Sequence, residues 1–164
     1  MKKALCITNF GQGVQFDVKY VYPNGKRMFQ FSVLDPFTKK YFFLIFPTKE
    51  SKNAITVFLE AQKYFGFNIL SVQTDNGSEF RGEFHKWLTS KNIIHYFIPK
   101  KSPWWNSNVE RVHKTVDDEF YHNPLRVFKT SIEWLNFYNF ERIHLSIKGL
   151  TPHEKFIQSV TLDC

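Results

Sequence analysis

The first half of the chain is a series of short extended segments separated by turn signals, and this pattern constrains the fold more than any other feature. Runs rich in β-branched and aromatic residues cover residues 14–22, 28–34 and 41–46. Pro23-Asn24-Gly25-Lys26 and Asp35-Pro36 interrupt these runs, and such breaks favour short connections between antiparallel neighbours. The sequence therefore predicts a three-stranded antiparallel meander.

Helical and extended segments then alternate. Residues 51–65 carry apolar side chains at helical spacing, and Gly66 follows where a left-handed cap residue belongs. A further strand is expected over residues 69–74, a short amphipathic helix around residues 84–88, and a strand over residues 93–98. This order predicts an α/β fold whose mixed five-stranded sheet has three antiparallel and then two parallel strands, with helices on both faces.

The second half is predicted to be mainly helical. Val109, Val112 and Val116 recur at helical intervals from Asn108 onward. If these valines face the core, a neighbouring face carries Glu110, Lys114 and Asp117. A further helix is expected from a second set of apolar residues, namely Leu125, Phe128, Ile132, Leu135 and Tyr138.

The composition favours a single globular domain that meets phosphates. The 22 Lys and Arg residues exceed the 15 Asp and Glu residues, which gives a formal charge of +7 and a pI near 9.4. A basic but merely solvated surface is the competing interpretation. The two cysteines, Cys6 and Cys164, suggest neither a disulfide framework nor a thiol metal site, and no run reaches the roughly 20 apolar residues of a membrane span. We expect a cytoplasmic, nucleoid-associated protein.

Three separated acids are candidate metal ligands. Asp17 lies inside an apolar run, Asp75 ends another and is followed by Asn76-Gly77, and Glu110 opens a helix. Hard carboxylate oxygens select Mg²⁺ or Mn²⁺, and a pair of ions roughly 3.5–4 Å apart promotes phosphodiester cleavage or transfer. The three acids therefore predict a two-metal site for phosphoryl transfer.

Each acid also has a simpler interpretation. Asp17 can be a carboxylate without a function, but an unpaired carboxylate in an apolar strand is costly unless a cation or hydrogen-bond donors compensate for its burial. Asp75 can serve as a turn former, because Asp-Asn-Gly is a favourable turn sequence. Glu110 can belong to a capping box with Ser107, or form a surface pair with Lys114.

Several motifs together resemble the catalytic core shared by retroviral integrases and bacterial insertion-sequence transposases, the DDE family on an RNase H-like fold. Gln15-Phe16-Asp17-Val18-Lys19-Tyr20 is similar to the first-strand motif, and Thr74-Asp75-Asn76-Gly77-Ser78-Glu79-Phe80 is similar to T-D-N-G-x-E-F. Ser102-Pro103-Trp104 through Asn106, then Val109-Glu110-Arg111, resembles the third motif. Tyr138-Asn139, Arg142, His144, Gly149 and Thr151-Pro152 resemble a C-terminal signature of bacterial transposases.

This resemblance implies a DNA cleavage and strand-transfer enzyme that uses Mg²⁺ or Mn²⁺, two ions in the active complex, with Asp17, Asp75 and Glu110 as catalytic ligands. It implies DNA as partner, both element ends and target, and at least a homodimer on DNA. Lys114 matches a position that contacts DNA near the cleavage site. The other candidate DNA contacts are Arg111, His113, Asn76, Lys100 and Lys101, although a solvated surface remains an alternative for Arg111 and His113.

The resemblance further implies an N-terminal extension over residues 1–12, a catalytic core over residues 13–140 and a C-terminal tail over residues 141–164. Family members also carry an N-terminal helix-turn-helix region, which we expect to be missing here. Some features depart from the family: 34 residues separate Asp75 from Glu110, one fewer than is usual, and Ile143 replaces a usual Pro. A ribonuclease H-like nuclease and a catalytically inactive nucleic-acid-binding remnant are the alternative functions.

Overall fold

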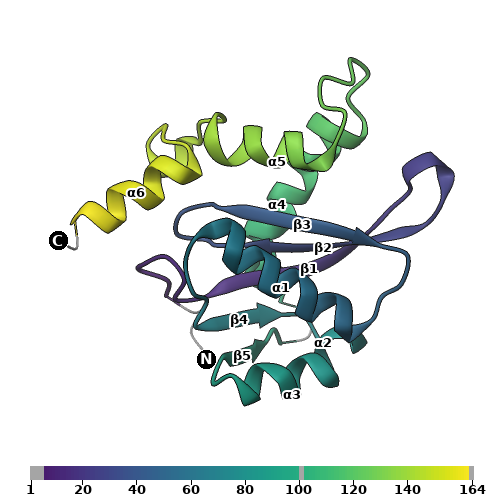
Figure 1. Ribbon diagram of the computed structural model, residues 1–164, viewed down its shortest axis with the longest axis vertical. Helices are drawn as coiled ribbons and strands as arrows, with labels where there is room; N and C mark the ends of the chain where they lie inside the picture. Colours follow the sequence, from purple (N-terminus) through teal and green to yellow (C-terminus); the bar gives the residue numbers. More distant parts are fainter. Residues whose placement is uncertain (1–5, 100–101, 163–164) are drawn as a thin grey trace.

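A five-stranded mixed sheet forms the centre of the molecule, in a computed structural model that describes residues 6–99 and 102–162 (Figure 1). The strand order is β3-β2-β1-β4-β5, with β1, β2 and β3 antiparallel and with β4 and β5 parallel to β1. The predicted meander and mixed sheet are therefore confirmed. The strands are β1 (Val14–Val21), β2 (Met28–Leu34), β3 (Tyr41–Phe46), β4 (Ser71–Thr74) and β5 (Ile94–Phe97).

Helices flank the sheet, as predicted (Figure 1). The α-helices are α1 (Ser51–Phe65), α2 (Ser78–Arg81), α3 (Glu83–Ser90), α4 (Ser107–Val116), α5 (Ser131–Phe140) and α6 (Pro152–Leu162). A π-helical turn, η3 (Asp117–Tyr121), continues α4, and three short 3-10 turns are η1 (Pro23–Gly25), η2 (Pro103–Asn106) and η4 (Leu145–Ile147). Within the described residues, no helix is both long enough and apolar enough to cross a bilayer.

Helix α1 has the predicted bounds. Gly66 ends the helix in the left-handed conformation, with φ 82°, and its N–H donates to the carbonyl oxygen of Gln62 at 3.0 Å. The residues predicted to face the core include Ala54, Phe58 and Ala61, and all three are fully buried. Hydrophobic spacing and one glycine therefore located this element without tertiary information.

Strand β1 separates two environments because its side chains alternate between the faces of the sheet. Phe16 is fully buried on one face, where its ring lies 5.0 Å from that of Phe80 and 5.5 Å from that of Phe84. Asp17 consequently lies on the opposite face, beneath α4. Aromatic packing around Phe16 thus fixes the position of β1, and this determines where Asp17 lies.

The last helices differ most from the sequence prediction. Helix α5 begins at Ser131, and Leu125 lies before it with 80% of its surface exposed. Thr130 and Glu133 form a reciprocal capping box at this start, and this local signal defines the boundary. Helices α2 and α6 were not predicted as helices. The ring of Phe156 on α6 packs 4.9 Å from that of Phe10, so α6 contacts the segment that precedes β1.

Asn139 joins the C-terminal helices to the edge of the sheet. Its Oδ1 accepts from the N–H of Tyr41 at 2.9 Å, and its Nδ2 donates to the carbonyl oxygen of Tyr41 at 2.8 Å. The side-chain amide thus replaces a neighbouring strand at this point of β3. Tyr138 packs beside it, with its ring 5.6 Å from that of Tyr41. The Tyr-Asn pair of the C-terminal signature therefore has a structural explanation.

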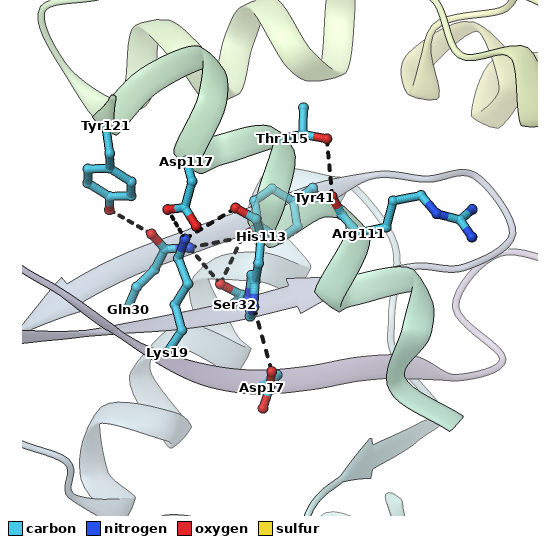
Figure 2. Close-up of polar contacts among 10 residues, drawn as sticks. All are labelled: Asp17, Lys19, Gln30, Ser32, Tyr41, Arg111, His113, Thr115, Asp117 and Tyr121. Atoms are coloured by element: carbon cyan, nitrogen blue, oxygen red, sulfur yellow. Dashed lines mark hydrogen bonds and ion pairs between the residues drawn. The ribbon is translucent and has the colours of Figure 1, made fainter. Parts of the chain in front are cut away.

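A buried polar network crosses β2 and β3 beneath the end of α4 (Figure 2). Gln30 Nε2 donates to Tyr41 Oη at 3.0 Å, and the Tyr41 hydroxyl donates to Ser32 Oγ at 2.8 Å. The Tyr121 hydroxyl, on the π-helical turn, donates to Gln30 Oε1 at 2.6 Å. Because buried polar groups are costly unless they are paired, this network fixes where the extension of α4 meets the sheet.

Candidate active site

The parallel pairing of β1 with β4 brings the first two acids to the same level of the sheet. Gln15 is the Cα partner of Gln73 across this pair. Asp17 and Asp75 each follow two residues later, Asp17 within β1 and Asp75 immediately beyond the carboxyl end of β4. Ligand sites of open α/β sheets form at such strand ends, next to a switch in strand order.

The third acid is positioned by hydrogen bonds from the same two strands. The side-chain amides of Gln15 and Gln73 both donate to the carbonyl oxygen of Trp105, at 2.9 and 2.6 Å. Gln15 Oε1 also accepts from the N–H of Val109 at 3.1 Å. These bonds dock the start of α4 onto the sheet beside Asp17, and Glu110 projects from the first turn of that helix.

Packing of α4 follows the predicted face. Val109, Val112 and Val116 are buried, whereas Glu110 is exposed. The capping-box interpretation of Glu110 is wrong. Ser107 lies inside the helix, and Asn106, the residue at the N-cap position, makes no capping hydrogen bond with its side chain. Glu110 is therefore an exposed acid in the first turn of α4.

Electrostatics connect the acids. The pKa of the Asp17 carboxyl is raised to about 7, first by burial and then by the negative charge of Asp75, with further contributions from Glu110 and Glu79. The N–H of Val18 opposes this rise in the pKa. Like charges that destabilise one another's ionised form must lie close together. Asp75 and Glu110 thus act on the buried Asp17 carboxyl through their negative charge, after the larger effect of burial.

The three carboxylates do not form a closed ligand cage. Across residues 6–99 and 102–162, no group of three or more His, Cys, Asp or Glu side chains is arranged to hold a metal ion. Asp75 and Glu110 are exposed, and Asp75 Oδ1 accepts from the N–H of Gly77 at 2.9 Å, so Asp75 does also form the turn that was its alternative role. The donors are carboxylate oxygens, which are the ligands that Mg²⁺ and Mn²⁺ prefer.

Glu79 is a fourth acid near the site, and the sequence did not single it out. Its side chain is 1% exposed, Oε1 lies 3.0 Å from Lys49 Nζ, and Oε2 is buried without a hydrogen-bond partner. Its carboxylate packs so tightly against Gly77 that a Cβ there would lie 2.5 Å from Oε1. The only signal in the sequence was its place in the segment Thr74–Phe80, four residues beyond Asp75.

His113 is part of α4, and its side chain points toward β1 and faces Asp17 (Figure 2). Its Nδ1 is 3.6 Å from Asp17 Oδ2, and burial followed by the positive charge of Lys19 lowers the pKa of the imidazole to about 3. Lys19 Nζ donates to the His113 carbonyl oxygen at 3.2 Å and pairs with Asp117. Lys19 thus fastens the end of α4 to β1, and a neutral imidazole borders the buried acid.

The candidate DNA contacts occupy different environments. Arg111 and Lys114 are exposed on α4, and Figure 2 shows that Arg111 points away from Asp17. His113 is 8% exposed and is directed toward β1. Asn76 is engaged within the protein, because its Nδ2 donates to the Ile98 carbonyl oxygen at 2.7 Å and its Oδ1 accepts from Arg81 at 3.0 Å. Lys100 and Lys101 lie outside the described residues.

The strand order β3-β2-β1-β4-β5 and the helices around it are those of the RNase H-like fold of integrase cores. Residues 8–103 match the family described as the integrase core domain, and the chain belongs to this family. A putative integrase, ORF3 of Spiroplasma virus SpV1-C74, is 30% identical over 175 residues, an alignment that covers 91% of this chain. The chain spans about half, 48%, of the length of that relative.

Solved integrase structures share the fold. The catalytic core domain of HTLV-2 integrase in complex with magnesium, in a trimeric form, matches with a TM-score of 0.76 at 19% identity, over 91% of this chain and 98% of that one. The simian T-cell lymphotropic virus intasome, in complex with the PP2A regulatory subunit B56 gamma, matches with a TM-score of 0.77 at 20% identity, over 89% of this chain and 54% of that one. The BIV integrase core matches with a TM-score of 0.69 at 16% identity, over 91% and 97%.

Proposed function

We propose that this chain is the catalytic core of a metal-dependent polynucleotidyl transferase of a mobile element, which cleaves DNA and joins the resulting end to a target. The observation that carries the proposal is the register of β1 with β4 on an integrase-type sheet, which brings Asp17 and Asp75 to one level while Gln15 and Gln73 dock the start of α4 beside them. Burial, and after it the charges of neighbouring acids, raises the pKa of the Asp17 carboxyl, and a cation bound there would relieve both effects.

Asp17, Asp75 and Glu110 would hold divalent ions at the end of β4. Bound ions of this kind supply positive charge to the reacting phosphate and lower the pKa of an attacking water or hydroxyl. The protein contributes placement: Gln15 and Gln73 hold α4 at a fixed height above the sheet, and this sets the separation between Glu110 and the two aspartates. Phosphoryl transfer depends on such positioning together with charge stabilisation.

The proposed partners are DNA and further copies of the chain. The relatives support both: one is a putative integrase, one solved core is described in dimeric and trimeric forms, and one is part of an intasome. The positive net charge of +7 supports contact with a polyanion. Mg²⁺ or Mn²⁺ is the proposed cofactor, and magnesium is named in the HTLV-2 integrase complex.

Disintegration of a pre-joined DNA substrate is the most direct test, because it requires the catalytic site and no recognition of free element ends. We expect joined and released strands to appear only with Mg²⁺ or Mn²⁺. Asp75→Asn and Glu110→Gln should each lower the rate by at least about 100-fold, while the circular dichroism spectrum stays that of the parent chain. Cleavage without joining would indicate a nuclease, and DNA binding without metal-dependent products would indicate an inactive remnant.

Metal binding can be tested independently of turnover. Any ligand that binds only the folded state raises its stability. Mg²⁺ should therefore raise the melting temperature of the parent chain and not that of Asp17→Asn. An equal rise in both proteins would show that the ion binds elsewhere and would contradict the proposed ligand set.

A further inference from the structure

A second site lies on another face of α4. A cavity of about 180 Å³ is bounded by four basic residues, Lys39, Arg111, Arg142 and His144, and by neutral groups that include Asn108. These residues come from three separate parts of the chain: the turn between β2 and β3, helix α4, and the segment after α5. None of the described residues that line the cavity is acidic.

The turn that carries Lys39 is rigidly built. Lys39 has a left-handed backbone, with φ 67°, a conformation that is unfavourable for a non-glycine residue. Asp35 stabilises this turn: its carbonyl oxygen accepts from the Lys39 N–H at 2.8 Å, and its buried carboxylate accepts from the Thr38 N–H at 2.8 Å. Lys39 Nζ then reaches across to α4 and donates to Asn108 Oδ1 at 3.3 Å. The amine is thus held at the cavity before any ligand arrives.

Positive charge accumulates around the cavity without a matching carboxylate in its lining. Burial and then the charge of Arg111 lower the pKa of Lys39. Burial and then the charge of Arg142 lower the pKa of His144 to about 4. Arg142 Nε lies 2.9 Å from Glu119 Oε1, which offsets part of the charge from behind the cavity. The positive charge of the cavity thus comes from Lys39, Arg111 and Arg142, with His144 neutral, and a bound anion would relieve the repulsion among these cations.

Helix geometry separates this site from the catalytic acids. Asn108, Arg111 and Thr115 lie three and four residues apart and share one side of α4, and all three line the cavity. Because successive residues point in different directions around a helix, Glu110 does not share this side. Figure 2 shows that Arg111 points away from Asp17. A group bound in the cavity would therefore sit beside the active site and not within it.

We propose that this cavity binds one backbone phosphate of a DNA strand, away from the phosphate that reacts. Its volume is below the roughly 300–1,000 Å³ of pockets that enclose drug-sized ligands, which suits a single ionic group. Guanidinium groups recognise phosphate oxygens in a bidentate manner, and the lysine adds a point charge. The inference rests on the proposed function in taking DNA as the ligand, and it assigns the Arg and His of the C-terminal signature to substrate binding.

The test measures DNA binding in the Asp75→Asn background with EDTA, so that it requires no catalysis and its outcome is separable from that of the disintegration assay. Lys39→Gln and Arg111→Gln should each weaken binding of a duplex by about 3- to 30-fold, and the slope of log affinity against log salt should fall by about one in magnitude. Lys86→Gln, an exposed lysine on α3, is the matched control and should change neither quantity. Circular dichroism and melting temperature check that each variant is folded.

A parallel arm adds inorganic phosphate to the parent chain and to Arg111→Gln. Weaker DNA binding in both cavity variants, with the control unchanged, supports a backbone phosphate site. Stabilisation by inorganic phosphate that is lost in Arg111→Gln, without any change in DNA affinity, would assign the cavity to a free phosphate and overturn the proposal. Unchanged DNA affinity together with no response to phosphate would overturn it as well.

Discussion

Gln15 and Gln73, partners on the parallel strands β1 and β4, donate their side-chain amides to the same acceptor, the carbonyl oxygen of Trp105. One backbone oxygen thereby receives two hydrogen bonds, and both are made immediately before α4 begins. Because each glutamine lies two residues before an acid, the same pairing that aligns Asp17 with Asp75 also locates Glu110. The geometry of the candidate site thus depends on two neutral residues.

Replacement of Gln73 by alanine should loosen the start of α4. Gln73 is 7% exposed, and loss of its 2.6 Å hydrogen bond should lower the free energy of unfolding by about 1–2 kcal/mol. Strand-transfer activity should fall more steeply than stability, because Glu110 loses its fixed position. Chemical denaturation and the disintegration assay measure the two effects. Gln158→Ala, an exposed glutamine on α6, is the control, and a similar loss in both variants would contradict the anchoring role.

The pair formed by Lys49 and Glu79 should respond unequally to the loss of either partner. Glu79 is nearly fully buried, whereas the Lys49 side chain is 31% exposed. Lys49→Met leaves a buried carboxylate unpaired beside other acids and should cost about 1–3 kcal/mol, whereas Glu79→Gln removes that charge and should cost less. Urea denaturation measures this difference. Lys52→Met is the control, since its partner Glu50 is exposed, and it should leave stability unchanged. A greater loss from Glu79→Gln would refute this ranking.

Lys40 should make stability depend on pH in the alkaline range. The side chain is buried, with Nζ 2.9 Å from the carbonyl oxygen of Phe65, and burial lowers the pKa of the amine to about 8, against a partial opposing effect of Asp35. Folding therefore disfavours the charged form of the amine. This lowers the free energy of unfolding by its full amount below pH 8, and the loss of stability disappears as the pH rises toward 10.5.

The measurement compares the parent chain with Lys40→Met from pH 7 to pH 10. Between these values the unfolded parent chain binds more protons than the folded one, so its stability should rise relative to the variant by about 1–3 kcal/mol. The comparison with the variant removes the contribution of tyrosines that titrate in both proteins. A constant difference across the range would show that the amine keeps its ordinary pKa.

Asn139 should be among the residues least tolerant of substitution outside the acids. Asn139→Leu keeps the size of the side chain but leaves the N–H and carbonyl oxygen of Tyr41 without the partners described above, at a cost of about 2–4 kcal/mol. Thermal unfolding measures the loss. Asn136→Leu, on an exposed part of the same helix, provides the comparison and should cost much less. Equal losses would show that the amide does not anchor α5.

Local signals in the sequence predicted most of the sheet and α1, because turn residues and side-chain periodicity act over a few residues. Helix α5 was placed incorrectly because Leu125 and Phe128 continue its apolar spacing, whereas the Thr130 capping box sets the start. A similar pattern at Ser107 and Glu110 forms no cap. Sequence alone could not distinguish the two, since a cap depends on where the chain enters the helix.

The candidate site was predicted in part. Motif resemblance singled out Asp17, Asp75 and Glu110, and their role as metal ligands stays a prediction; the strand register brings Asp17 and Asp75 to the same level of the sheet. The sequence could not show that His113 is directed inward, because which side of a helix is buried depends on what packs against it. The burial of Glu79 could not be predicted from the sequence either. Its carboxylate is enclosed by Lys49, which is distant in sequence, and by Gly77, and these residues come together only in the fold.

The two hydrogen bonds between the Asn139 side-chain amide and the backbone of Tyr41 have a consequence for solubility. Strand β3 is an outer strand of the sheet, and an outer strand with unoccupied N–H and C=O groups can recruit a strand from another molecule. Asn139 occupies these groups at Tyr41, so α5 also acts as a guard against edge-to-edge aggregation. Versions of the chain shortened before α5 should consequently self-associate during refolding, even though Asp17, Asp75 and Glu110 would all remain.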